Sequence, residues 1–283
     1  MKLLKDFKEE LFERLLSIHW RQWNALGASG HGDEEKKWII DLEALLVSSI
    51  NLARREKRLS QFIHNWERQN KEWINYSRMK HIVHYFMKQN TDKKIDFFSE
   101  NIFTTNSEHL KKSVCADVVP KKRSLLQFTL RGIFGINARA ETYLYLFFNK
   151  IGNSNEIARH IYFDQKIVYR ILERWTEINF VHKQKKGYAL KNYSLIDYTK
   201  GQSYYLDWVK IFVLLNMIIE VLNKDPWQNE LYLLSSFFRD ITEDAQEVGH
   251  YFNIEFPDPV LYKGTEFFEP FIESVLELLK KIG

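Results

Sequence analysis

The chain of 283 residues contains one cysteine, five prolines and no long uninterrupted hydrophobic run. The single cysteine, Cys115, excludes an intramolecular disulfide and is typical of a reducing cytosol. The longest apolar stretch, residues 211–219, is interrupted by Asn216 and is too short to span a bilayer. The N-terminal residues are amphipathic and lack the apolar core of a signal peptide. We therefore expect a cytoplasmic protein that has no membrane partner.

The motifs of common enzyme classes are also lacking. The sequence contains no nucleophile elbow, no metalloprotease helix and no kinase signature. The glycine-rich stretch 27–33 has no following Lys-Ser/Thr pair and no preceding buried strand, so we interpret it as a loop. Cys115 has no neighbouring residue that would mark it as a reactive thiol. We expect a protein that is not an enzyme.

Two groups of residues have only part of the spacing of a metal site. His81 and His84 are three positions apart on a helical pattern, and His64 or Asp41 could supply a third ligand. Glu247-x-x-His250 matches half of a di-iron carboxylate motif, and the second half is missing. We expect no metal and no cofactor. A catalytic site in the N-terminal region would have to use four residues without a recognised geometry: Asp41, Glu43, His81 and His84.

Charge is distributed unevenly, although the formal net charge is only +4. Residues 1–109 have a net charge of +2, residues 110–149 and 150–200 have +5 each, and residues 201–283 have −8. A basic patch in the middle of the chain favours a polyphosphate partner and makes binding dependent on salt. The alternative is that these lysines and arginines only solvate an exposed helix face.

Helical periodicity dominates on both sides of the middle. Helices are predicted over residues 3–26, 36–58, 60–88, 203–223, 228–240 and from about Glu269 to 281. The stretch 90–120 has weaker periodicity, and Gly132 and Gly135 indicate a break between two helices. We expect a mainly α protein in three parts: a helical domain (1–110), a central domain (120–195) and a C-terminal helical region with a possible dimerisation role (201–283).

The segment 138–190 has the pattern of three helices followed by a short β-hairpin. An apolar helix over 138–149 precedes a Gly152-Asn153 break, and Ser154 is a candidate N-cap for a short second helix. Asp164 is predicted to cap a third helix, which Asn179 ends because asparagine tolerates the left-handed conformation. That helix has one apolar stripe at i, i+3, i+4 and i+7: Val168, Ile171, Leu172 and Trp175. Short alternating runs at 180–182 and 188–190 then predict a hairpin with a basic tip, 183–187.

The residues NEIARHIYFDQKIVYRILERWTEINFV resemble the helix-turn-helix of MarR-like and ArsR-like bacterial regulators. Seven positions fit the pattern of these regulators: Val168, Arg170, Ile171, Leu172, Trp175, Phe180 and Val181. Asn179 replaces the usual glycine, and Gln165-Lys166-Ile167 replaces the usual Ser/Thr-rich start, which leaves the base preference open. The resemblance covers about a fifth of the chain and implies a central winged helix-turn-helix with a small β-hairpin.

The resemblance also implies which side chains meet DNA, because the second helix of such a motif enters the major groove. Four residues of its exposed N-terminal half are predicted base contacts: Gln165, Lys166, Tyr169 and Arg170. Six others are predicted phosphate contacts: Ser154, Asn155, Arg174, Lys183, Lys185 and Lys186. Glutamine can read adenine and arginine can read guanine by paired hydrogen bonds.

We therefore expect a sequence-specific, double-stranded-DNA-binding transcriptional regulator. We expect a homodimer, which would place two recognition helices at half-sites about 34 Å apart. The flanking helices would form the dimer interface, or a sensor or partner-binding domain. The alternative is a protein-partner scaffold or antitoxin-like autoregulator, which uses the winged helix for interaction with another protein.

Overall fold

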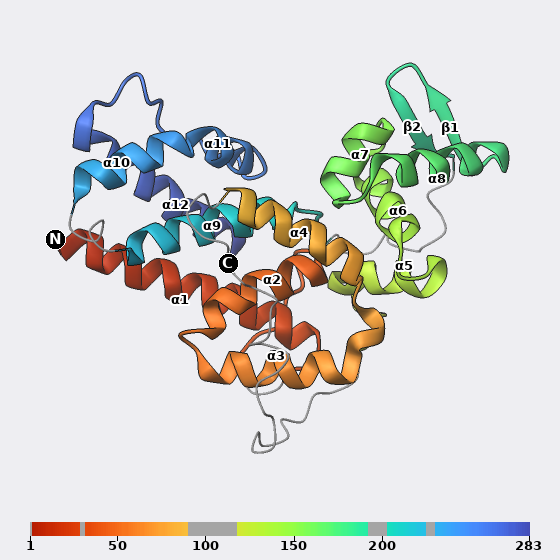
Figure 1. Cartoon of the computed structure of the whole chain (residues 1–283), viewed down its shortest axis with the longest axis horizontal. Helices are drawn as coiled ribbons and strands as arrows, with labels where there is room; N and C mark the ends of the chain where they lie inside the picture. Colours follow the sequence, from red (N-terminus) through yellow and green to blue (C-terminus); the bar gives the residue numbers. More distant parts are fainter. Residues whose placement is uncertain (1, 29–31, 90–117, 192–202, 225–229) are drawn as a thin grey trace.

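The computed structural model describes residues 2–28, 32–89, 118–191, 203–224 and 230–283. Over these ranges the chain is mainly helical, with twelve α-helices and one two-stranded antiparallel sheet. None of the helices described is both long and apolar enough to cross a membrane. Figure 1 shows two groups of elements, a larger group of helices on the left and a smaller group that includes the hairpin on the right.

The larger group, which we call the helical body, contains eight helices from both ends of the chain. They are α1 (Lys2–Ala25), α2 (Leu42–Ala53), α3 (Lys57–Asn70), α4 (Tyr76–Gln89), α9 (Trp208–Asn223), α10 (Leu231–Asp240), α11 (Thr242–His250) and α12 (Phe268–Ile282). Short 3₁₀ helices precede α4 and α12: η1 (Lys71–Trp73) and η5 (Gly264–Phe267). The strongly apolar α9 packs against α1, α2, α4 and α11. The N-terminal and C-terminal helices therefore share one hydrophobic core.

The smaller group, which we call the hairpin module, spans residues 126–190 and follows the 3₁₀ helix η3 (Arg123–Leu125). Its elements are α5 (Leu126–Phe134), α6 (Ala138–Asn149), α7 (Ser154–Ile161), α8 (Gln165–Glu177), β1 (Val181–Gln184) and β2 (Gly187–Leu190). In the hairpin Val181 pairs with Leu190, and Gln184 pairs with Gly187. The module has its own hydrophobic cluster, to which the predicted stripe of α8 contributes all four of its residues.

Some helix boundaries predicted from the sequence are wrong. The helix predicted over 36–58 begins only at Leu42, because the backbone N–H groups of Ile39 and Ile40 donate to Tyr204 O (2.9 Å) and Ser124 O (2.8 Å) instead. The segment predicted as one helix over 60–88 is divided between α3 and α4. Helix α11 was not predicted, whereas the prediction for α1 is confirmed to within one residue at each end.

A chain of buried hydrogen bonds crosses the core of the body. The Nδ1 atom of His19 lies 2.8 Å from Leu15 O, and because a carbonyl can only accept, Nδ1 carries the ring proton. The other ring nitrogen accepts from the hydroxyl of Ser48 (2.9 Å). That hydroxyl in turn accepts from the side-chain amide of Asn216 (2.8 Å). Burial lowers the pKa of His19 from 6.5 to about 4, so the imidazole is neutral in the folded chain.

This lowered pKa predicts an acid-sensitive contribution to stability. Below pH 6.5 the unfolded chain takes up a proton at His19, and the folded chain does so only near pH 4. We expect this residue to remove about 3 kcal/mol from the free energy of unfolding as the pH falls from 7 to 4. Urea unfolding at both pH values measures the loss in the wild type and in His19→Gln. Equal pH dependence in the two proteins would contradict the prediction.

Candidate functional site

Helices α7 and α8 are joined by three residues and are capped by asparagine and aspartate. The side chain of Asn153 caps α7 by accepting from the N–H groups of Asn155 (3.1 Å) and Glu156 (2.9 Å). The predicted cap, Ser154, is therefore wrong, because this residue is the first of the helix. Its hydroxyl lies 2.9 Å from the Gln165 side-chain amide. Asp164 caps α8, as predicted, by accepting from the N–H of Lys166 (2.7 Å).

The end of α8 directs the chain into the hairpin. Asn179 adopts the left-handed conformation with φ of 60°, which confirms the prediction for this residue. The N–H of Asn179 donates to Thr176 O (3.0 Å), and the N–H of Phe180 donates to Trp175 O (2.8 Å). The rings of Phe180 and Trp175 also pack edge to face, with centroids 5.0 Å apart. These contacts make a Schellman motif, which satisfies the last carbonyls of the helix.

The hairpin is fixed to the start of α7 by a close crossing of two glycines. The N–H of Gly152 donates to Tyr188 O (3.1 Å), and the N–H of Tyr188 donates to Gly152 O (2.8 Å). Gly187 has φ of 148°, and a Cβ atom at this position would lie 2.4 Å from the carbonyl carbon and oxygen of Gly152. Only glycine fits this backbone approach. The residues before α7 thereby extend the sheet by one isolated bridge.

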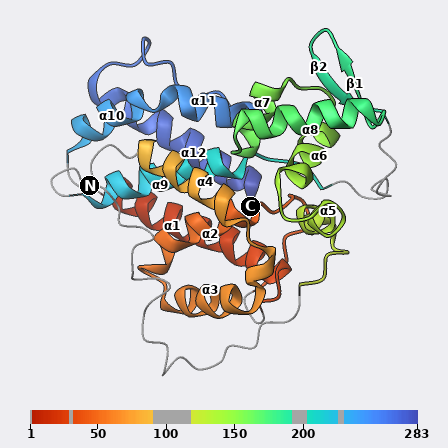
Figure 2. The same ribbon diagram turned by 45° about the vertical axis from the view of Figure 1, so that its right-hand side comes forward.

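The predicted contact residues lie on adjoining elements of the module. The four predicted base contacts on α8 are all exposed: Gln165, Lys166, Tyr169 and Arg170. Five of the six predicted phosphate contacts are exposed as well: Asn155, Arg174, Lys183, Lys185 and Lys186. The sixth, Ser154, is half-buried against Gln165. Figure 2 shows α7, α8 and the hairpin side by side, with the hairpin projecting away from the helical body.

Two acidic side chains near these basic residues, Glu173 and Asp164, form hydrogen bonds within the module. Glu173 accepts from the hydroxyl of Tyr188 (2.6 Å) and lies 3.7 Å from the amine of Lys183. Hydrogen bonding with Tyr188 raises the pKa of the Lys183 amine. Asp164 is used as a helix cap. The exposed residues of α8 and the hairpin include six basic side chains and one acidic side chain, Glu177, so this surface is mainly cationic.

A buried ion-pair network joins the module to the helical body. Arg131 on α5 lies 2.6 Å from both Glu43 on α2 and Glu141 on α6. Arg78 on α4 lies 2.7 Å from Glu43 and 2.5 Å from Asp41. Both arginines and both glutamates are at most 3% exposed. Burial alone would raise the pKa of Asp41, but the neighbouring Arg78 holds it below its usual value.

The turn between α7 and α8 is held by the body through its backbone and through Tyr162. The Nε atom of Arg78 donates to Ile161 O (2.9 Å), and Nδ1 of His81 lies 3.1 Å from Tyr162 O. Tyr162 has φ of 57°, and its hydroxyl donates to the buried Asp207 (3.2 Å). Burial raises the pKa of Asp207. The body thus determines the orientation of α8.

Four of the residues considered for metal binding or catalysis have other partners within the fold. His81 contacts the turn, Asp41 and Glu43 are ion-paired, and Glu247 pairs with Lys210. In the part of the chain that the structure describes, no group of three or more His, Cys, Asp or Glu is arranged to hold a metal ion. Cys115 lies outside the described residues.

Arg78, Arg131 and Glu141 were not identified from the sequence as residues that hold the module against the body, and the only site considered for Glu43 was catalytic. Arg131 and Glu141 are charged residues within apolar helices, which is a signal of buried pairing. Their partner Glu43 is far away in the chain, and the spacing along one helix does not identify it.

Comparison of the chain with known protein families, with curated proteins and with solved structures finds no significant match. The resemblance of residues 138–190 to MarR-like and ArsR-like regulators therefore stays a prediction.

Replacing Arg131 tests the buried network. Arg131→Met leaves the carboxylates of Glu43 and Glu141 without their shared cation, and we expect it to lower the free energy of unfolding by about 3–5 kcal/mol. The matched control is Arg139→Met, because Arg139 is exposed on α6 and its replacement should cost less than about 0.5 kcal/mol. Urea unfolding measures both. Similar small losses in the two variants would contradict the role of the network.

Replacing Gly187 tests the glycine crossing. Gly187→Ala forces a Cβ atom into the backbone of Gly152 at a positive φ, and we expect a loss of about 1–3 kcal/mol in unfolding free energy. Gly132 provides the control, because it lies in α5 with open space at its Cβ position. Gly132→Ala should stabilise the chain by about 0.5–1 kcal/mol. A stable Gly187→Ala protein with an unchanged unfolding midpoint would contradict the crossing.

Proposed function

We propose that this chain is a sequence-specific, double-stranded-DNA-binding transcriptional regulator. In this proposal α6, α7, α8 and the hairpin form a winged helix-turn-helix. The observation that supports it most directly is the exposed N-terminal half of α8 beside a hairpin with three exposed lysines, Lys183, Lys185 and Lys186. Glu173 on α8 contacts two residues of the hairpin, Tyr188 and Lys183. This contact joins the helix to the hairpin and favours one continuous binding surface.

In the proposed complex α8 lies in the major groove. Its 13 residues give a length of about 20 Å, and the groove is about 12 Å wide, which admits a helix. Arg170 would read guanine through its two guanidinium donors, and Gln165 would read adenine. Lys166 and Tyr169 flank these residues on the exposed side.

The remaining basic residues would bind the phosphate backbone on either side of the helix. Arg174 follows Arg170 by one turn of α8, and the hairpin lysines lie beyond Glu173. Each phosphate neutralised adds about −0.9 to the slope of log affinity against log salt. A two-fold dimer would place two copies of α8 in successive turns of the groove, about 34 Å apart.

A second candidate function is a protein-partner scaffold or antitoxin-like autoregulator. Two apolar side chains on α8 favour it, because Ile167 is 46% exposed and Tyr169 is 44% exposed. Exposed aromatic side chains are common at protein interfaces. In this role the same face of α8 would contact another protein.

Arg170→Ala tests the leading proposal. The side chain is exposed, so the fold should be kept, and we expect specific affinity to fall to the level of scrambled DNA. Fluorescence anisotropy would compare DNA upstream of the chain's own coding region with scrambled DNA at several salt concentrations. Arg139→Ala serves as the control, because Arg139 is exposed on α6, outside the predicted contacts.

The wild type should prefer the upstream DNA by about a hundredfold or more. Unchanged affinity of Arg170→Ala would overturn the role of this residue. Equal and steeply salt-dependent binding to both DNAs would indicate only a basic surface. An absence of binding, together with copurification of a stoichiometric partner, would favour the second candidate.

A further inference from the structure

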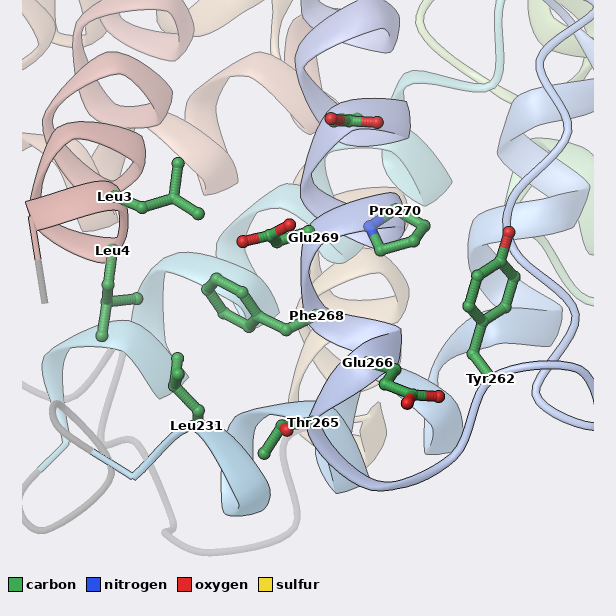
Figure 3. A pocket seen from close by; sticks show the side chains of 10 residues that line it. Leu3, Leu4, Leu231, Tyr262, Thr265, Glu266, Phe268, Glu269 and Pro270 are labelled. Atoms are coloured by element: carbon green, nitrogen blue, oxygen red, sulfur yellow. The ribbon is translucent and has the colours of Figure 1, made fainter.

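The helical body has a groove far from the hairpin module. It has a volume of about 690 Å³ and is formed by the first turn of α1, the start of α10, η5 and the start of α12. Figure 3 shows Leu3, Leu4 and Leu231 on one side of Phe268 and Glu269. In Figure 1 the start of α1 and α10 lie at the left end of the molecule, and the hairpin lies at the right. A molecule in this groove would leave α8 accessible.

The floor of the groove is apolar and its rim holds two leucines that the fold leaves partly uncovered. Leu4 and Phe268 are 7% and 2% exposed and form part of the body's core. Leu3 and Leu231, in contrast, are 48% and 38% exposed, and both line the groove. Covering these two side chains removes apolar surface from water, which favours binding of an apolar partner surface.

One wall of the groove is acidic. Glu266, Glu269 and Glu273 line it, all three are exposed, and their spacing of three and four residues places them along one side of η5 and α12. No lysine or arginine is among the described residues that line the groove. Within the described ranges, none of these three carboxylates is paired with a hydrogen-bond donor or a cation. Their charge is therefore available to a partner.

We propose that this groove binds a basic amphipathic helix of a partner protein. A helix of this kind presents apolar side chains at i, i+3 or i+4 and i+7, which would cover Leu3 and Leu231. Lysines or arginines beside that stripe would face Glu266, Glu269 and Glu273. The charge complementarity selects a cationic partner segment over a neutral or acidic one. The site is separate from the surface proposed for DNA, so each can fail without the other.

The test uses the full chain and a defined probe. The probe is a fluorescent peptide of roughly 14 residues, built from leucine and lysine in an amphipathic helical pattern. Anisotropy titrations at about 50 mM and about 500 mM salt separate the ionic contribution from the apolar one. A peptide with glutamate in place of lysine should not bind.

Two groove variants remove the ionic and the apolar contribution separately. Replacing Glu266, Glu269 and Glu273 by glutamine should weaken probe binding about tenfold or more at low salt and much less at high salt. Replacing Leu3 and Leu231 by serine should weaken it about tenfold at both. The control replaces three exposed acids elsewhere by glutamine and should keep affinity within about twofold: Glu72, Glu177 and Glu243.

The outcomes are distinguishable. Equal weakening by the groove triple variant and by the control triple variant would overturn the proposal, because it would show general attraction to an acidic surface. So would a wild type that does not bind the probe. If the chain alone sediments as a dimer that the leucine substitutions dissociate, the groove is instead an interface between two copies. Circular dichroism on each variant confirms that a loss of binding is not a loss of fold.

Discussion

The arrangement of the whole chain depends on one buried guanidinium, that of Arg131, between the carboxylates of Glu43 and Glu141. Removing an ion from water costs several kcal/mol, and the cost is offset only where the charge has close partners in good geometry. Arg131 meets this condition, because its Nε, Nη1 and Nη2 atoms all donate hydrogen bonds. These ion pairs therefore form in only one placement of α5 and α6 against α2. Apolar packing on either side stabilises that placement.

The turn before α8 holds this exposed helix in a fixed position relative to the helical body. A left-handed conformation costs a non-glycine residue roughly 1–2 kcal/mol, and Tyr162 adopts it with φ of 57°. The hydroxyl of Tyr162 bonds to Asp207, and its ring packs edge to face on Tyr85 with centroids 5.4 Å apart. These contacts offset the cost, so three residues both connect two helices and attach them to the body.

Local signals made much of the hairpin module predictable. The stripe of α8 lies within one helix, and Asp164 and Asn179 act on backbone groups only a few residues away. The cap of α7 was predicted at Ser154, one residue after the actual cap Asn153, because serine and asparagine are both preferred N-cap residues. The exposed surface of α8 could be predicted, whereas what it binds depends on the shape of a partner.

Features that depend on distant partners could not be predicted. Residues 36–41 have helical periodicity, but the N–H groups of Ile39 and Ile40 bond to Tyr204 and Ser124, which are far away in sequence. Glu43 likewise has the position of a favourable charge in the first turn of a helix, and only the folded chain shows it to be fully buried. The sequence near Glu43 does not show whether water or an arginine is the partner of this carboxylate.

The shared core of the helical body has a consequence for how the chain is made. Helix α1 packs against α9 and α12, and the whole hairpin module lies between them in the sequence. During synthesis the apolar face of α1 leaves the ribosome long before its partners α9 and α12 exist. The module can form its own hydrophobic cluster before the body is complete. Until then the apolar surface of the earlier helix stays exposed, and incomplete chains with such surface are prone to aggregate. Because the hairpin module is inserted into the sequence of the helical body, the first helix would benefit more from a chaperone during synthesis than the module would.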